Sequence, residues 1–144
     1  MKSNDFQSAI QQDRIVAAIA KAEQHTSGDI RVAVSRRHVD DALLTAREEF
    51  TRHGLTQTRD RNAVLIFIAP VSQCFAIVGD EAVDRVAGKE FWSEVAAATE
   101  AHFRAGDFTG GLVLAIDRVG AVLARHFPRR PDDTNELPDA VIEH

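Results

Sequence analysis

The sequence predicts an α/β protein with a three-layer α/β/α sandwich, in which helices flank a small mixed sheet of two parallel strands plus an antiparallel hairpin strand. Amphipathic segments with helical spacing alternate with short runs of branched apolar residues. Their order is helix, strand, helix, strand, strand, followed by helices up to residue 127. A strand, helix, strand unit makes parallel strands through a right-handed crossover, and a short turn reverses the third strand.

The first half of the chain supplies the crossover unit. Apolar residues recur at near-helical spacing over residues 10–22, which predicts an amphipathic helix that ends before Gly28. The β-branched run "IRVAV", residues 30–34, predicts the first strand. Helical spacing returns over residues 41–50, and Asp40 is a candidate N-cap for that helix.

A hairpin and a set of helices follow. The continuous apolar run of residues 63–69 predicts a strand buried on both faces, and "PVSQ" predicts a turn into the strand of residues 74–79. The later spacing predicts helices, the last with Thr109 as N-cap, over residues 81–86, 89–103 and 110–127.

Length and composition predict one domain, residues 1–127, and a polar, proline-rich tail, residues 128–144, that is extended over the surface or disordered. The formal net charge of -5 argues against nucleic acid as a partner. A lone cysteine, Cys74, excludes an intrachain disulfide. The N-terminus lacks a secretory pattern, and the longest apolar run falls far short of the roughly 20 residues of a membrane span. We therefore expect a cytoplasmic monomer without a transmembrane segment.

Strand directions bring three loops to one edge of the predicted sheet. The parallel strands both begin there and the hairpin strand ends there, so "TSGD", "TRDRN" and "GDEAVD" should meet. Carboxylate and amide oxygens are the ligands of Ca²⁺ or Mg²⁺. The alternative is that these residues only form turns and cap helices. The candidate metal ligands are Asp29, Asp60, Asn62, Asp80, Glu81 and Asp84.

The same edge carries candidate anion-binding arginines: Arg31, Arg59 and Arg61. Arginine binds phosphate or carboxylate through a planar fork, but a set of surface ion pairs is the alternative that we favour. No histidine pair with metal-ligand spacing and no serine nucleophile elbow is present. The sequence therefore identifies no catalytic residue, and an enzymatic activity is left open.

Five motifs in order, "TSGDIRV", "RDRNAVLIFIA", "AIVGDEAVDRV", "FRAGDFTGGL" and "HFPRRPDDTNELPD", resemble the TPM domain family, in its short stand-alone bacterial branch. The resemblance implies a three-layer α/β sandwich. It also implies two activities, because the family includes a plant protein described as an acid phosphatase and small bacterial proteins described as binding divalent cations, notably calcium, at loops on one sheet edge. The positions that match those loops are the six candidate metal ligands.

Three hypotheses about function follow. The first is a module that binds a divalent cation at the sheet edge, with Ca²⁺ preferred over Mg²⁺. The second is a metal-assisted phosphatase that acts on phosphomonoesters, with Arg59 or Arg61 orienting the phosphate. The third is a protein interaction module without a ligand, which uses the tail from residue 128 onwards as its contact surface.

Overall fold

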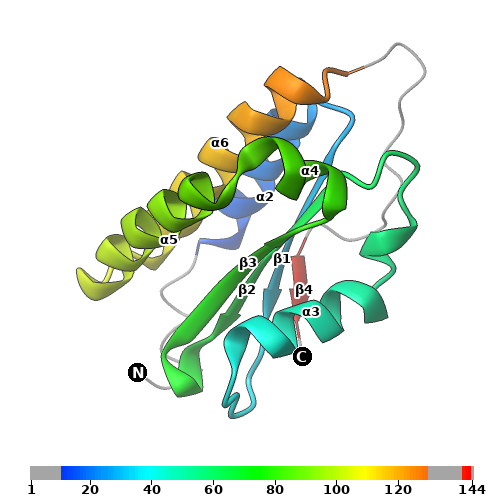
Figure 1. Cartoon of the computed structure of the whole chain (residues 1–144). Coiled ribbons are helices and arrows are strands. Elements are labelled where there is room, and N and C mark those ends of the chain that lie inside the picture. Colours follow the sequence, from blue (N-terminus) through cyan, green and yellow to red (C-terminus); the bar gives the residue numbers. More distant parts are fainter. Residues whose placement is uncertain (1–10, 130–140, 144) are drawn as a thin grey trace.

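The computed structural model describes residues 11–129 and 141–143, the latter by their backbone alone. Element labels are those of Figure 1. The helices are α2 (Gln12–Glu23), α3 (Ala42–Arg52), α4 (Glu81–Ala87), α5 (Lys89–Arg104) and α6 (Phe108–His126). The strands are β1 (Asp29–Val34), β2 (Ala63–Ala69), β3 (Cys74–Gly79) and β4 (Val141–Glu143). Single turns of 3₁₀-helix cover Leu55–Gln57 and Pro70–Ser72.

The sheet has the order β3-β2-β1-β4. Strands β1 and β2 are parallel with Asp29 opposite Ala63, and β3 runs antiparallel to β2 with Gly79 opposite Val64. The predicted fold class and mixed topology are therefore confirmed. One strand was not predicted: β4 pairs in parallel with β1 at the other side of the sheet. The rest of the predicted tail from residue 130 lies outside the described residues.

Helices cover both faces of the sheet, as Figure 1 shows: α3 lies on one face, and α2, α5 and α6 lie on the other. Every residue of β1 and β2 is buried, because successive side chains of these central strands enter opposite cores. The larger core joins β1 and β2 to α2, α5 and α6 through side chains such as Ile66 and Ile116. The smaller core packs α3, through Ala46 and Phe50, against the other face.

Helix caps show where local prediction succeeded and failed. Asp80 caps α4 by accepting the Glu81 N–H at 2.9 Å, as a strand-end aspartate can. The prediction of Asp40 for α3 was wrong, because Asp41 accepts the Leu44 N–H instead. The prediction of Thr109 for α6 was also wrong. Asp107 caps that helix, and Thr109 is buried inside it with its Oγ1 accepting the Gln11 N–H at 3.0 Å.

Candidate functional site

The three predicted loops meet at one end of the sheet, which we call the loop edge: residues 26–29, 58–62 and 79–84. Backbone hydrogen bonds join two of them to each other. The Asp80 N–H donates to the Ala63 carbonyl at 2.9 Å, and the Ala82 N–H donates to the Arg61 carbonyl at 3.2 Å. The start of α4 is therefore fixed against the entrance of β2.

Arg61 lies at the centre of this junction, in what we call the Arg61 cluster: Arg61, Asp80 and Glu81. Its Nε lies 2.7 Å from Asp80 Oδ2 and its Nη2 lies 2.9 Å from Asp80 Oδ1, so the contact is bidentate. Its Nη1 lies 3.6 Å from Glu81 Oε1. The hydrogen bond to Asp80 raises the pKa of Arg61, and the charges of both carboxylates add to the effect.

Burial is uneven within the Arg61 cluster. The Asp80 side chain is only 6% exposed, whereas that of Arg61 is 41% exposed and that of Glu81 60% exposed. The backbone of Arg61 is left-handed, with φ of 52°, a conformation that few non-glycine residues adopt. Arg61 and Glu81 therefore contact solvent, whereas the Asp80 carboxylate is buried beneath the guanidinium.

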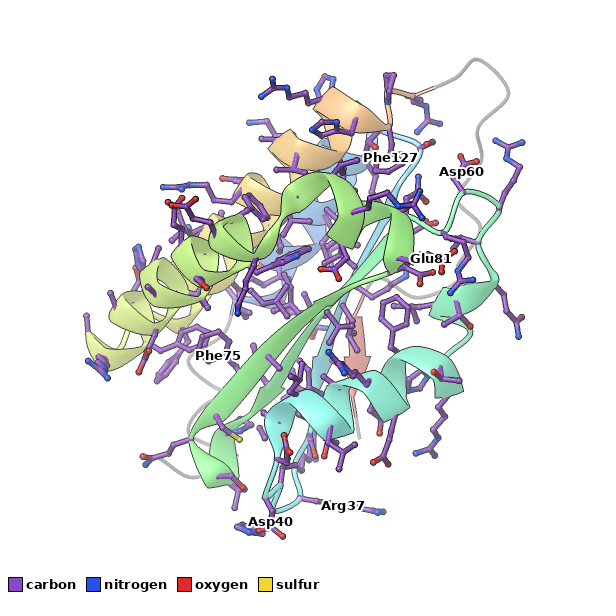
Figure 2. All side chains as sticks on the ribbon, viewed as in Figure 1. Arg37, Asp40, Asp60, Phe75, Glu81 and Phe127 are labelled. Carbon is purple, nitrogen blue, oxygen red and sulfur yellow. The ribbon has the colours of Figure 1, made fainter. Side chains whose placement is uncertain are left out.

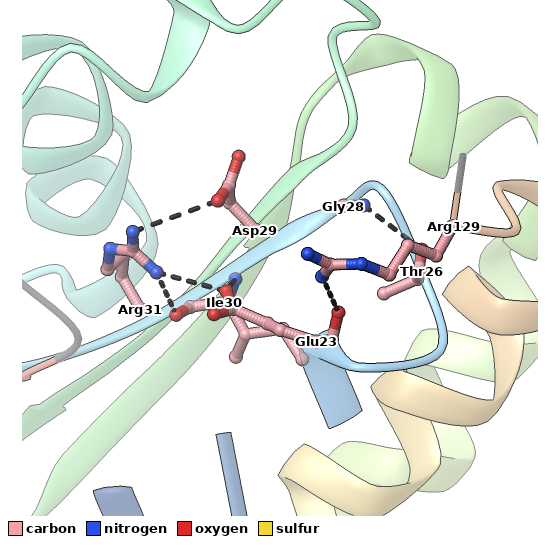
Figure 3. Close-up of polar contacts among 7 residues, drawn as sticks. All are labelled: Glu23, Thr26, Gly28, Asp29, Ile30, Arg31 and Arg129. Carbon is pink, nitrogen blue, oxygen red and sulfur yellow. Dashed lines mark hydrogen bonds and ion pairs between the residues drawn. The ribbon is translucent and has the colours of Figure 1, made fainter. Parts of the chain in front are cut away.

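Arg31 forms a second group, the Arg31 cluster, with Glu23 and Asp29 (Figure 3). Its Nη1 lies 3.1 Å from Glu23 Oε2 and donates to the Ile30 carbonyl at 2.7 Å, and its Nη2 lies 3.7 Å from Asp29 Oδ1. The same Glu23 oxygen accepts the Ile30 N–H at 2.9 Å. Because the Arg31 side chain is 1% exposed, this arginine holds the end of α2 against β1 and faces no solvent.

Thr26, a residue that the sequence analysis did not single out, organises the loop before β1. It is 2% exposed. Its one hydroxyl proton is shared between the carbonyls of Leu123 and Phe127, and its Oγ1 accepts the Gly28 N–H at 3.0 Å. Gly28 allows close approach, since a Cβ there would lie 3.0 Å from the Asn62 carbonyl oxygen. The combination of threonine and glycine in "TSGD" was the available signal.

The remaining candidates lie in different surroundings. The side-chain amide of Asn62 donates to Ser27 Oγ at 3.2 Å, so this residue ties the loop before β2 to the loop before β1. Asp84 accepts the indole N–H of Trp92 at 2.9 Å and so faces α5. Arg59 is exposed and Asp60 is partly exposed. Figure 2 shows Asp60 and Glu81 at the same end of the molecule.

The contacts thus divide the predicted ligands. Asp29 belongs to the Arg31 cluster, Asp84 pairs with Trp92, and Asp80 and Glu81 belong to the Arg61 cluster. Among the described residues, no three His, Cys, Asp or Glu side chains are already gathered as a metal site. A cation at the loop edge would therefore have to compete with Arg61 for Asp80.

Cys74 lies at the opposite end of β3 from Asp80. Its Sγ approaches the Val39 carbonyl at 3.9 Å. Burial raises the pKa of this thiol, with a smaller contribution from the charge of Asp41. At neutral pH the thiol therefore stays protonated and is a poor nucleophile.

A protein-family model, described as "TPM domain", matches residues 3–122. The chain belongs to the TPM domain family. This TPM domain is similar to the BA42 protein of the psychrophilic bacterium Bizionia argentinensis, known from an NMR structure. The two have a TM-score of 0.84 and 33% sequence identity, over 94% of this chain and 95% of that one.

A more distant likeness concerns the fold alone. The N-terminal domain of a protein from P. gingivalis, solved by NMR, has a TM-score of 0.55 at 16% identity, over 79% of this TPM domain and 76% of that chain. No curated protein matches the sequence. Within the described part of the TPM domain, no helix is long and apolar enough to cross a membrane.

Proposed function

We propose that this TPM domain binds a divalent cation at the loop edge, with Ca²⁺ as the first candidate and Mg²⁺ as the second. Asp80 and Glu81 would be ligands, with Asp60 added from the neighbouring loop. The observation that supports the proposal is the Arg61 cluster, in which one positive group already lies between two carboxylates. A hard cation satisfies the same carboxylates through oxygen coordination.

Exchange between Arg61 and the cation is the central step of the proposal. Arg61 is 41% exposed, so its guanidinium regains water when it leaves Asp80. Asp80 itself stays in place, because it also accepts the Glu81 N–H and its own N–H donates to Ala63. Binding would then lock the loop before β2 to the start of α4 by a shared ion.

The phosphatase hypothesis has less support than cation binding. Arg31 is buried in ion pairs and Arg61 contacts Asp80, so neither faces solvent as a free phosphate-binding fork. Arg59 is exposed, but nothing in the described residues identifies a phosphate site beside it. Hydrolysis of p-nitrophenyl phosphate, followed with Ca²⁺ or Mg²⁺ and again in EDTA, would support the phosphatase only if Asp80→Asn abolished the turnover.

The decisive experiment is titration of the full chain with CaCl₂ and then MgCl₂, followed by ¹H–¹⁵N NMR. We expect saturable shifts at the amides of Asp60, Asp80 and Glu81. Asp80→Asn should weaken the Ca²⁺ affinity by about tenfold, because a coordinating charge is lost. The matched control is Glu94→Gln at an exposed position of α5, which removes one negative charge elsewhere.

A second variant tests the exchange itself. Arg61→Ala should tighten Ca²⁺ binding by about fivefold, since the cation no longer displaces an exposed ion-pair partner. Weaker binding in Arg61→Ala would argue against competition at Asp80. Chemical-shift changes that increased linearly with CaCl₂ concentration and spread over all acidic residues would indicate nonspecific screening and would contradict the proposal.

A further inference from the structure

The outer edge of β3 is an open sheet edge. β3 stands last in the order β3-β2-β1-β4, and within the described residues no strand pairs with its outer side. All of its residues are only partly buried, whereas every residue of β1 and β2 is buried. Among the residues that the structure describes, no strand therefore uses the hydrogen-bonding groups on the outer side of β3.

The register of the β2–β3 hairpin identifies the groups that point outwards. The Asp80 N–H donates to the Ala63 carbonyl, so this opposed pair is hydrogen-bonded across the ladder. Hydrogen-bonded and non-hydrogen-bonded pairs alternate in an antiparallel ladder. The hydrogen-bonded pairs along β3 are therefore those of Val78, Ala76 and Cys74. The backbone N–H and C=O groups of Phe75, Ile77 and Gly79, which lie in the intervening pairs, point away from β2.

Nothing in the sequence of β3 blocks this edge. The strand reads "CFAIVG" and contains neither a charged residue nor a proline. Its pairing with β2 is continuous from Cys74 to Gly79, without a bulge. Charged residues, proline and bulges are the usual means by which proteins protect an edge strand from pairing. Their absence leaves β3 competent to accept another strand.

A groove of about 630 Å³ lies over the second half of this edge. Leu43 and Arg47 of α3 line one wall, Lys89 and Trp92 of α5 line the other, and Gly79 lies between them. Because α3 and α5 cover opposite faces of the sheet, a groove lined by both must open at the edge of β3. Figure 1 shows β3 running between α3 on one side and α4 and α5 on the other.

The charges in the groove indicate the chemistry of its occupant. Arg47 and Lys89 are exposed, one on each wall. The charge of Asp80 is offset by Arg61, so the Asp84 carboxylate, which accepts the indole N–H of Trp92, is one negative charge against the two positive charges of Arg47 and Lys89. Leu43, 46% exposed, adds apolar surface. An occupant with apolar side chains between acidic ends would complement both features.

We propose that this groove binds an extended, acidic-ended segment of a partner protein, which adds to β3 as an extra strand. Backbone hydrogen bonds to Phe75, Ile77 and Gly79 would provide affinity, and contacts with Arg47 and Lys89 would provide selectivity. A second copy of this chain fits less well, because its own β3 lies between the same two helical walls. Pairing of two copies through this edge would also bring the Arg47 and Lys89 side chains of both grooves together, and like charges repel.

The test uses the peptide acetyl-Glu-Val-Thr-Val-Thr-Val-Glu-amide with the ¹⁵N-labelled full chain. EDTA is present throughout, so that the result does not depend on cation binding. In the free protein we expect rapid amide exchange at Phe75, Ile77 and Gly79, and slow exchange at Ala76 and Val78. The peptide should slow exchange at the first three alone. Slow exchange there in the free protein would mean that the edge is already covered, and would overturn the proposal.

Two N-methylated versions of the peptide provide a matched chemical control. One carries N-methyl groups at the odd positions and the other at the even positions, so they are nearly identical in composition. An added strand directs alternate N–H groups to its neighbour. Only one of the two sets should abolish binding. Equal behaviour of the two peptides would exclude strand addition.

Charge variants locate the site. The double variant Arg47→Glu with Lys89→Glu should weaken peptide binding by about tenfold, because both walls become repulsive. Lys21→Glu with Arg118→Glu makes the same change in net charge at exposed positions of α2 and α6, and should leave binding unchanged. If both double variants weaken binding equally, or if the peptide produces no shifts along β3, the groove is not the binding site.

Discussion

Arg61 lies in the loop edge and Arg31 lies just inside β1, and each contacts two carboxylates. The Arg31 side chain is 1% exposed and that of Arg61 is 41% exposed. Arg31 also donates to the carbonyl of Ile30, in the strand that carries it. Each cluster holds a buried carboxylate, Asp29 in one and Asp80 in the other, so the two differ in the exposure of the arginine: the guanidinium of Arg61 contacts water and that of Arg31 does not. The Arg31 cluster is therefore structural, and the Arg61 cluster is the one in which we propose that a cation replaces the arginine.

The largest effect that we predict is for Arg31→Ala. Removal of the guanidinium leaves Glu23 and Asp29 near a buried strand without their cation, which should cost about 3 to 5 kcal/mol of unfolding free energy. Urea unfolding followed by circular dichroism measures it. The control is Lys21→Ala, an exposed position on α2. If Arg31→Ala lost no more unfolding free energy than the control, burial would not make the ion pairs of Arg31 more stabilising than those of Arg61.

Thr26→Val tests the loop that supports the Arg31 cluster. The substitution keeps the side-chain volume but removes the hydroxyl that serves Gly28, Leu123 and Phe127. We expect a loss of about 1 to 3 kcal/mol, because buried partners are left unsatisfied. Thr51→Val, at an exposed site on α3, is the control for the change of residue type. Equal midpoints in thermal unfolding for the two variants would contradict the assigned role.

In the Arg61 cluster, Asp80 is the part with a structural role. Asp80→Ala removes the N-cap of α4 and should cost about 1 kcal/mol, whereas Asp80→Asn keeps a cap and should cost less. Chemical denaturation of both variants measures the difference. If the two variants lost the same stability, the ion pair with Arg61 rather than the cap would be the stabilising contact.

Salt distinguishes the two arginines directly. Arg61→Ala should reduce stability less than Arg31→Ala does. That reduction should also shrink in about 1 M NaCl, where charges are screened beyond about 3 Å. The effect of Arg31→Ala should persist, because buried groups are screened little. Chemical denaturation at low and at high salt provides the measurement. If the loss of stability in Arg61→Ala did not change with salt, Arg61 would behave as a buried ion-pair partner like Arg31.

The smallest predicted effect concerns Asp107, an exposed cap far from either cluster. Hydrogen bonds from His102 and from the Gly110 N–H lower the pKa of Asp107 in the folded protein. Its contribution is therefore complete above the unfolded pKa of about 4 and is lost as the pH falls through the lower folded value. The free energy of unfolding, measured against pH for the wild type and for Asp107→Asn, should differ near neutral pH and become equal at the acid end. A difference in unfolding free energy that did not change with pH would contradict a stabilising role for the ionised Asp107 carboxylate.

The sequence predicted the convergence of the loop edge because strand direction follows from connectivity. A crossover makes β1 and β2 parallel and a tight turn makes β3 antiparallel, whatever the side chains are. It did not predict that Arg31 would pair with Glu23, because Glu23 lies on α2 and the pairing depends on how that helix packs. Nor did it predict the Asp84 to Trp92 contact, which depends on the angle between α4 and α5.

The sequence by itself determined the family, the fold class and the ends of β2 and β3, because apolar periodicity and turn residues are local properties. Tertiary structure alone decided which charges are buried, which carboxylates already have partners, and that β4 pairs beyond β1 while, within the described residues, no strand pairs with the outer side of β3. Those properties depend on side chains brought together from distant segments. The groove between α3 and α5 also depends on tertiary structure, since it forms only when both helices have packed on the sheet.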